Sequence, residues 1–439
     1  MIKAFLRRVA FDYIDKLPVV ISNVFANFIV KTQSSYFINE LKLLNKYIEN
    51  NIENNDEDLY DVRNILIVRL DAIGDIVWTT AFLRELRANY KNAKINLILR
   101  PVAKKVLENC PYINNMYTYD CLINNVEKKE NFKLLKVRAM LFMTEHLKKI
   151  GKYDMVFLPR EVFMNNGIEN LYLGIFSNAP IRVGRTYYTN ALEKARAKYI
   201  EPLFTNFTKL KNPKHETLQI LDELKTVNKK IENDNLELWM TDKEVAYARK
   251  WINNKGIKAN SYNIIIGLYG SSPNRSWKSE NYLQLTNRLK SYNGNEIKYI
   301  LVGDRKISKK INFPNNVIDI SGQTSLREVI AIISIADMYV GSDTGLMHIA
   351  TAFKLPVVEI SAHLKNGRIM DSGSPVLVGP WKVPSEILEP AYGKDGCVGW
   401  CTKNYSHCIN QISVNSVIKA VCNLLERTNN GYNCHSASI

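Results

Sequence analysis

Three short segments of the chain combine acidic, basic and small residues in patterns that could do chemistry. The first runs from Arg69 to Asp75 (RLDAIGD), where Gly74 permits a tight turn directly before an aspartate. A carboxylate in the first turn of a helix stabilises that helix as a cap, and capping alone could explain Asp75. If its side chain points into a cleft instead, Asp75 could act as a general base and take a proton from a hydroxyl group.

The second segment runs from Gly341 to His348 (GSDTGLMH) and follows a short apolar run. Its small residues would leave backbone N–H groups free at the start of a helix, which is a ready site for a diphosphate. His348 lies three residues after Gly345, on the first turn of the expected helix, and could reach the same anion. The alternative is an ordinary helix start with a packed histidine.

The third segment, Leu268–Trp277 (LYGSSPNRSW), is a loop rich in glycine, serine and proline. Gly270, Ser271 and Arg275 are placed there to bind phosphate oxygens, and Lys278 is a neighbouring alternative to the arginine. The competing interpretation is a lone surface arginine with no ligand.

Each of these segments follows a predicted strand. Apolar runs rich in β-branched residues predict buried parallel strands, and they alternate with helical patterns such as that from Ile76 to Tyr90. Such alternation indicates βαβ units, whose open parallel sheets bind ligands beyond the carboxyl ends of the strands. The predicted strands are 64–70, 95–99, 155–158, 263–268, 298–302, 338–340 and 357–360, and later helices are 280–290, 325–335 and 346–353.

The length of 439 residues is too great for one ordinary core, so we expect two doubly wound α/β domains and an appendage. The predicted division is an N-terminal helical extension over residues 1–60, a first Rossmann-like domain over 61–230 and a second over 231–439. Within the extension, apolar residues from Ile2 to Leu17 recur at helical spacing. This helix would lie on an anionic membrane surface or, as is more common for amphipathic helices, pack on the protein's own core.

The net charge of +16 and the pI of about 9.3 suit anionic partners, which include phosphate-bearing substrates, acidic membranes and nucleic acids. No nucleic-acid-binding motif is recognisable, so we expect no nucleic acid partner. The sequence has no apolar run of about 18 residues that could span a bilayer. Asp12 and Asp15 interrupt any secretory signal, so we expect a cytoplasmic protein.

The seven cysteines are an odd number, which fits a reducing compartment better than a disulfide framework. Cys397, Cys401, His407 and Cys408 lie within twelve residues, with Cys422 further on, and these side chains could ligate a metal. The spacing is not a standard zinc pattern. We therefore expect reduced structural cysteines and no metal, with a site at Cys397, Cys401, Cys408 and Cys422 as the alternative.

In this order and at this separation, the segments resemble a known family. The runs NILIVRLDAIGDIVWTTAFLRELR and SGQTSLREVIAIISIADMYVGSDTGLMHIATAFKLPVVEI resemble glycosyltransferase family 9, which contains the ADP-heptose:lipopolysaccharide heptosyltransferases. Smaller similarities are Ile181–Gly184, the His215-Glu216 helix start and NRSWKSENYLQL. The resemblance extends over residues 62–425.

The resemblance implies a GT-B architecture, in which two Rossmann-like domains face each other across a cleft. The acceptor would bind the N-terminal half and the nucleotide-sugar donor the C-terminal half. Asp75 matches the family's proposed general base, and Arg275 matches a position that is usually lysine and faces the donor phosphates. The remaining matches to the donor-binding element are Asp343, Thr344, Gly345 and His348. Candidate contacts to the acceptor or to phosphate are Arg69, Gly74 and Arg182.

The implied reaction is inverting transfer of heptose from ADP-heptose to a lipopolysaccharide core acceptor, with no metal cofactor. The implied partners are the nucleotide-sugar, a lipid-linked glycan acceptor and a membrane surface. Asp71 and Ala72 stand where the family often has serine or threonine, which leaves the local charge and the choice of acceptor open. Another nucleotide-sugar donor or a protein acceptor therefore stays an alternative. Intact Asp75 together with the intact donor element argues against a non-catalytic scaffold.

Overall fold

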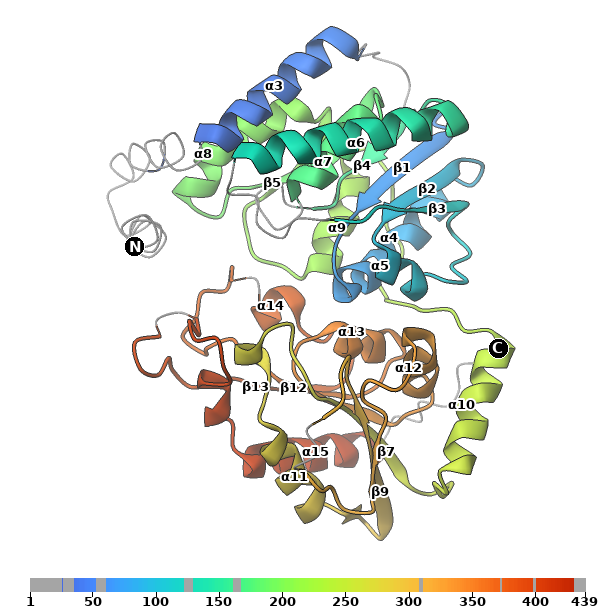
Figure 1. Ribbon diagram of the computed structural model, residues 1–439, viewed down its shortest axis with the longest axis vertical. Coiled ribbons are helices and arrows are strands. Elements are labelled where there is room, and N and C mark those ends of the chain that lie inside the picture. The colour runs from blue at the N-terminus through green and yellow to red at the C-terminus, as the bar shows by residue number, and fades with distance from the viewer. Residues whose placement is uncertain are drawn as a thin grey trace.

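The computed structural model of the protein describes Ala26 and residues 35–52, 61–121, 129–160, 167–307, 311–371, 373–397 and 400–429. The amphipathic helix expected over residues 2–17 and the last cysteine, Cys434, lie outside these ranges. The described residues form two α/β halves, one above the other in Figure 1, each built around its own parallel sheet.

The first half is built on a six-stranded parallel sheet with the order β3-β2-β1-β4-β5-β6. The order reverses between β1 and β4, which is the kind of switch point where open α/β sheets bind ligands. The strands are β1 (Asn64–Arg69), β2 (Lys94–Leu99), β3 (Asn115–Thr118), β4 (Met155–Phe157), β5 (Ile181–Tyr187) and β6 (Asn206–Leu210).

Helices cover both faces of this sheet, and the side chains of β1 are apolar on both faces. Ile65 and Ile67 pack with α4 and α9, whereas Leu66 and Val68 pack with α3, α6 and α7. A strand buried on both faces reads as the continuous apolar run from which it was predicted. The helices are α3 (Ser35–Asn51), α4 (Ile73–Asn89), α5 (Pro101–Val106), α6 (Lys129–Ile150), α7 (Gly167–Phe176), α8 (Ala191–Ile200), η2 (Glu201–Leu203) and α9 (Glu216–Lys225).

Helix α3 belongs to the N-terminal extension, yet it packs on the first half. Its side chains Leu41, Leu44 and Ile48 are buried in the same apolar cluster as α6 and α7. Burial of each such side chain stabilises the folded chain by about 1.5–3 kcal/mol. The described part of the extension is therefore integral to the first half.

The second half repeats the architecture, with a path β10-β9-β7-β11-β12-β13 and a short β8 antiparallel to β9. Its strands are β7 (Tyr262–Gly267), β8 (Ser291–Tyr292), β9 (Asn295–Val302), β10 (Val317–Asp319), β11 (Met338–Gly341), β12 (Val357–Ile360) and β13 (Ser385–Leu388). Its helices are α10 (Asp242–Asn254), η3 (Pro273–Arg275), α11 (Ser279–Arg288), α12 (Leu326–Ile333), α13 (Gly345–Ala352), α14 (Pro375–Val378), η4 (Cys408–Gln411) and α15 (Val414–Asn429).

The two halves meet through the first turns of two helices, α4 above and α13 below (Figure 1). A Cβ atom placed on Gly74 would lie 2.5 Å from Cδ2 of His348, and one placed on Gly345 would lie 2.6 Å from Cβ of Ile73. Only glycine allows these two helix starts to approach so closely. The link between α9 and α10, residues 226–241, has no helix or strand.

Candidate active site

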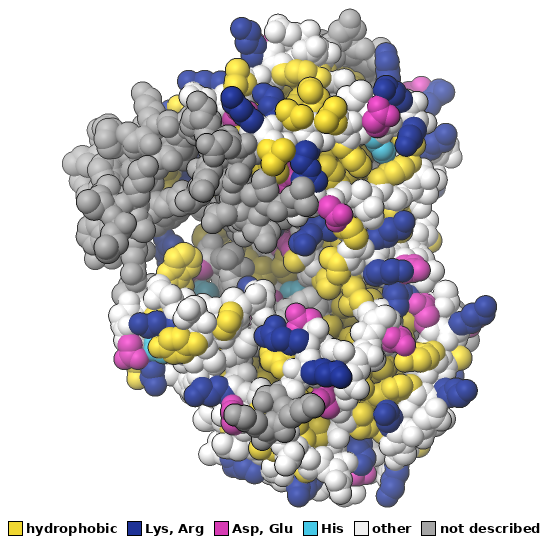
Figure 2. All heavy atoms as spheres, viewed as in Figure 1, with side chains coloured by type: hydrophobic (Ala, Val, Ile, Leu, Met, Phe, Trp, Pro, Cys, Tyr) yellow, Lys and Arg dark blue, Asp and Glu magenta, His cyan; other side chains and the backbone are white. Residues whose placement is uncertain are grey.

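The three segments singled out from the sequence all lie at carboxyl ends of strands. Asp75 follows β1, Arg275 follows β7, and Asp343 follows β11. The contact between α4 and α13 turns the two sheets so that these loops face the same region. Figure 2 shows that the surface is indented between the two halves, with histidine side chains visible inside the indentation.

Asp75 is the third residue of α4, and its side chain has both of the roles that the sequence left open. The backbone N–H of Ala72 donates to its Oδ2 at 3.2 Å, so the carboxylate does cap the helix. Its Oδ1 faces the guanidinium group of Arg160 at 3.3 Å and that of Arg69 at 3.7 Å. The side chain is 17% exposed, so it caps the helix and still reaches solvent.

The acidic neighbour Asp71 is buried and carries its own counter-charges. Its Oδ2 lies 3.0 Å from Nε of Arg69, and its Oδ1 lies 2.9 Å from Nε of Arg160. Two guanidinium groups therefore flank Asp71 and also reach Asp75. Because buried charges need partners, Asp71 fixes the two arginines in place beside the candidate base.

Asp75 is a stronger base in this setting than an ordinary aspartate. Burial is the largest cause that raises the pKa of Asp75, and the Asp71 carboxylate raises it further, while Arg160 and Arg69 oppose both effects. A carboxylate of raised pKa accepts a proton more readily, which is the property that a general base needs near neutral pH.

A second layer of charged side chains, none of which was predicted to belong to the site, lies behind this pair. Arg185 of β5 forms an ion pair with Glu216 and donates to the carbonyl of Pro159 at 3.0 Å. The same carbonyl accepts from Arg69. Glu223 lies 4.0 Å from Arg185 and is fully buried, so that burial raises its pKa to about 8. The signal that could have shown this layer is the row of charges on α9, which spaces Glu216 and Glu223 two helical turns apart.

Arg182 is the predicted contact that the structure places elsewhere. It lies near the amino end of β5, where it donates to the carbonyls of Leu203 at 3.0 Å and Pro180 at 2.9 Å. Burial lowers its pKa to about 10. Its guanidinium group thus holds together the opposite edge of the sheet from Asp75, and Arg185, three residues later, is the arginine of β5 that reaches the site.

On the facing half, Asp343 anchors the predicted donor element. Its Oδ2 forms an ion pair with Arg275, and its Oδ1 lies 3.1 Å from Nε2 of His348. Burial opposes ionisation, but the hydrogen bond from His348 and the charge of Arg275 together lower the pKa of Asp343. This carboxylate is therefore ionised and holds both cationic candidates in position.

His348 is buried and connects the two halves. Nε1 of Trp78 donates to its Nδ1 at 3.2 Å. An indole N–H can only donate, so Nδ1 must be the acceptor and Nε2 must carry the hydrogen that Asp343 accepts. Both ring nitrogens of His348 are therefore engaged, and the predicted effect of His348 on an anion would pass through Asp343.

The remaining predicted donor residues lie against Arg275 or at the start of α13. Gly270 lies against the backbone of Arg275. A Cβ atom placed on this glycine would lie 2.5 Å from the carbonyl oxygen of Arg275. The hydroxyl of Ser271 accepts from Nη1 of Arg275 at 3.1 Å. Thr344 is the N-cap of α13 but makes no side-chain cap hydrogen bond. The backbone N–H groups at the start of α13 could therefore donate to an anion. Arg275 and Asp343 line a pocket of about 130 Å³, together with Asn274, Ser361, Ala362, His363, Asp371, Gly373, Trp400 and Cys401.

Two aromatic contacts of His215, one of which joins the two halves, were also not expected. His215, the N-cap of α9, stacks on Trp381 with ring centroids 4.5 Å apart and lies edge-on to Trp78 at 5.9 Å. Burial lowers the pKa of His215 to about 4, so the ring is neutral and its Nε2 donates to the carbonyl of Gly379 at 3.0 Å. A neutral histidine there joins the halves without adding charge to the site.

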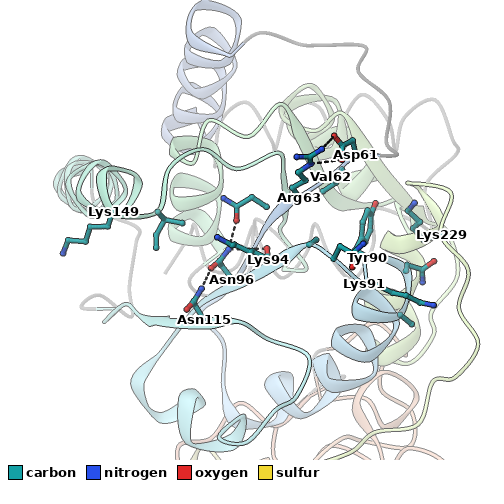
Figure 3. A pocket seen from close by; sticks show the side chains of 16 residues that line it. Asp61, Val62, Arg63, Tyr90, Lys91, Lys94, Asn96, Asn115, Lys149 and Lys229 are labelled. Atoms are coloured by element: carbon teal, nitrogen blue, oxygen red, sulfur yellow. Dashed lines mark hydrogen bonds and ion pairs between the residues drawn. The ribbon is translucent and has the colours of Figure 1, made fainter.

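A larger hollow lies at the opposite edge of the first sheet (Figure 3). It has a volume of about 970 Å³ and is lined by the amino ends of strands, such as Asn64 and Lys94, and by Lys91, Lys149 and Lys229. Asp61 and Arg63 pair with each other at its rim. It lies away from the carboxyl ends that carry Asp75, so size alone does not mark the catalytic site.

The structure brings some of the C-terminal cysteines together in one cluster. The side chains of Cys397, Cys401, His407 and Cys408 converge, with ligand atoms within 4.8 Å of one another. Cys422 lies apart on α15, where it packs in the core of the second half. Of the four cysteines weighed as metal ligands, the structure thus joins three and replaces the fourth with His407.

With this geometry in view, we compared the chain with known proteins. A sequence model of glycosyltransferase family 9 (heptosyltransferase) matches residues 189–383. The lipopolysaccharide core heptosyltransferase OpsX of Haemophilus influenzae is 23% identical over 318 residues, which make up 69% of this chain and 79% of that protein. The predicted resemblance to glycosyltransferase family 9 is confirmed by these matches.

Solved structures share the fold of this chain. A family 9 glycosyl transferase from Veillonella parvula superposes with a TM-score of 0.65 at 19% identity, covering 85% of this chain and all of the other. The ADP-heptose lps heptosyltransferase II of E. coli has a TM-score of 0.56 at 16% identity, covering 83% and 99% of the two chains. The predicted GT-B fold is confirmed by these likenesses.

In this glycosyltransferase the predicted donor element lies within the matched range, which includes Arg275, Asp343 and His348. Asp75 lies before that range and the cysteine cluster lies after it. Among the described helices, none is both long and apolar enough to cross a membrane.

Proposed function

We propose that this glycosyltransferase moves heptose from ADP-heptose to a lipopolysaccharide core acceptor, with inversion at the anomeric carbon. The observation that carries the proposal is the contact of Gly74 with His348, because it sets Asp75 beside the donor element of the other half. The names of the relatives support heptose as the sugar and ADP as the carrier.

In the proposed reaction, Asp75 accepts the proton of an acceptor hydroxyl while that oxygen attacks the anomeric carbon of the donor. The new glycosidic C–O bond forms as the bond from the sugar to the diphosphate breaks. Because attack and departure occur on opposite sides of the carbon, the configuration inverts. The raised pKa of Asp75 suits this role, and general-base help of this kind is worth about 10²–10⁴-fold in rate.

The donor half would stabilise the leaving ADP. Arg275 is 31% exposed, is held by Asp343 and Ser271, and can offer its outer N–H groups to the phosphate oxygens. The start of α13 adds backbone donors and the positive end of the helix dipole. Donors that are fixed before the reaction stabilise developing charge without reorganisation.

The test is transfer by the purified full-length chain, supplied with ADP-heptose and a heptose-deficient lipopolysaccharide core, with ADP release and acceptor mass both followed. We expect one heptose added per ADP released, and the inverted anomer by NMR. Asp75→Asn should slow turnover about 10²–10⁴-fold while ADP, titrated by calorimetry, binds as before. Asp61→Asn, which removes a carboxylate of similar type at the rim of the other hollow, is the matched control.

Four results would count against the proposal. Tighter binding of UDP, GDP or dTDP than of ADP would move the assignment to another nucleotide-sugar. Transfer to a protein instead of the core glycan would replace the acceptor. A retained anomeric configuration, or an Asp75→Asn enzyme with full turnover, would remove Asp75 as the general base.

A further inference from the structure

One cluster of reactive side chains lies outside the mechanism proposed above. Cys397, Cys401 and Cys408 surround the imidazole of His407, with Sγ atoms 3.8, 3.7 and 3.3 Å from its Nδ1. Cys397 and Cys408 are buried, and the four ligand atoms all lie within 4.8 Å of one another. Three sulfurs and a nitrogen thus point at a common centre.

The orientation of His407 indicates why they do so. Its Nε2 lies 2.9 Å from the Asp395 carboxylate, an acceptor, so Nε2 carries the ring hydrogen. Nδ1 therefore presents its single lone pair to the three sulfurs. One lone pair can accept only one S–H hydrogen bond, so His407 cannot accept from all three thiols at once.

The distances fit a tetrahedral metal site. With Zn–S of about 2.3 Å and Zn–N of about 2.0 Å, a tetrahedral ion would hold each sulfur about 3.5 Å from the nitrogen. The three observed distances lie on either side of that value. The backbone N–H of Thr402 points at Sγ of Cys397 at 3.4 Å, which favours the thiolate form that a metal requires.

We propose that Cys397, Cys401, His407 and Cys408 bind one Zn²⁺ ion. Four protein ligands leave no open position, so the ion is structural and takes no part in the chemistry. Asp395 orients His407 from outside, in the carboxylate–histidine–metal arrangement that metal sites commonly use.

The position of the site indicates what the bound ion would stabilise. The cysteine loop is bonded to the donor loop: Asn274 donates to the carbonyl of Cys401 at 3.0 Å, and Ser406 donates to that of Ser276 at 2.6 Å. Trp400 and Cys401 line the same pocket as Arg275. The ion would therefore hold one wall of the pocket and brace the loop that carries Arg275; this second step rests on the proposed function.

The first experiment measures metal on the full-length chain, purified under reducing conditions. Elemental analysis after loading with Zn²⁺ should give one ion per chain, and Co²⁺ in its place should give the intense d–d and sulfur-to-metal bands of a tetrahedral thiolate site. Another first-row metal at one per chain on the same ligands would support the site and overturn its assignment to zinc. Failure to retain any metal, or a disulfide among the three cysteines in the reduced protein, would overturn the site.

The variants separate the ligands from their neighbours. Cys401→Ser and Cys408→Ser should lose the ion, whereas Cys422→Ser, a cysteine of the same half outside the cluster, should retain it. Asp395→Asn should weaken Zn²⁺ binding about 10–100-fold. Because Asp395 is exposed, this variant keeps a folded chain even where a ligand variant does not. Equal metal retention by Cys401→Ser and Cys422→Ser would contradict the ligand set.

The bracing role has its own readout. Removal of Zn²⁺ should weaken ADP binding about 5-fold or more, and ADP must then tighten Zn²⁺ binding by the same factor, since coupling is reciprocal. Unchanged ADP affinity after zinc loss would overturn the bracing but leave the site. If ADP bound neither form, the proposed function would fail, while the metal content and the Co²⁺ spectrum would still report on the site.

Discussion

Trp78 and His348 lie on different halves of the molecule, and Nε1 of the tryptophan donates to Nδ1 of the histidine at 3.2 Å. The two rings also meet edge to face, with centroids 4.6 Å apart. The bond fixes the tautomer of His348 and thereby guarantees that Asp343 receives a hydrogen bond. Trp78 of the first half thus fixes the orientation of His348 and Asp343 in the second half.

Trp78→Phe tests this relationship, because phenylalanine keeps most of the ring packing but removes the donor. A buried acceptor left without its partner costs about 1–3 kcal/mol, so thermal unfolding should show a loss of that size. ADP affinity should fall as well, since His348 no longer holds Asp343 and Arg275 in one arrangement. Trp251→Phe on α10 is the control for a tryptophan outside the site. Loss of stability in Trp78→Phe with full ADP affinity would show that the bond is only structural.

Variants of Arg275 should show how much of the binding at the predicted phosphate site depends on positive charge and how much on the planar guanidinium group. One of its terminal nitrogens pairs with Asp343 and the other donates to Ser271, an arrangement that needs the planar fork of a guanidinium group. Hydrogen bonds to charged groups are worth about 1.5–3 kcal/mol, so Arg275→Ala should weaken ADP binding by about 10- to 150-fold. Arg275→Lys keeps the charge and should lose less. Calorimetric titration, with exposed Arg249→Ala as control, measures both. An alanine variant that binds ADP as tightly as the unchanged protein would remove Arg275 from the donor site.

Asp71 departs from the family pattern, and its effect should appear in the pH profile. Its carboxylate raises the pKa of Asp75, and it also draws Arg69 and Arg160 toward itself. Asp71→Asn removes the repulsion and frees both arginines to pair with Asp75, so the pKa of Asp75 should fall. The base is active when deprotonated, and the acid limb of kcat/KM should therefore move to lower pH. An acid limb that stays in place, or moves upward, would contradict this coupling. Asp61→Asn should leave the profile unchanged.

The order of strands and helices was open to prediction because local patterns fix it. The runs at β1, β7 and β11 are short, apolar and rich in β-branched residues, and each is followed by small residues and a helical period. Predicted bounds differ from those observed by a few residues at the ends, as at α4, which begins at Ile73 instead of Ile76. Capping explains that difference, since Asp75 bonds back to Ala72 and draws the helix start toward β1.

The site was predictable only where its residues are close in sequence. Asp343 and His348 are five residues apart and share a helix start, so a motif reveals them. Arg160 reaches Asp75 and Glu216 reaches Arg69 from segments that lie far apart in the sequence, and only the parallel sheet brings them together. The same limit explains Arg182, which was predicted from the family resemblance but lies at the other edge of the sheet. Arg185, three residues later and on the opposite face of the strand, is the arginine that reaches the site.

Glu223 should make the stability of the protein depend on pH in a way that its amide variant does not. In the folded chain its side chain is fully buried, and burial raises its pKa from 4.5 to about 8 although Arg185 and Arg69 oppose the shift. The folded state therefore binds the proton more tightly than the unfolded state. The stabilisation is complete below pH 4.5 and is lost as the pH rises toward about 8, at roughly 1.4 kcal/mol per pH unit.

Glu223→Gln cannot ionise, so the free energy of unfolding of the variant, measured by urea denaturation, should gain on that of the unchanged protein between pH 5 and about 8. The same substitution at the exposed Glu280 should give a difference that is flat over this range. A flat difference for Glu223→Gln as well would mean that Glu223 is ionised in the folded chain and is a working counter-charge to Arg185.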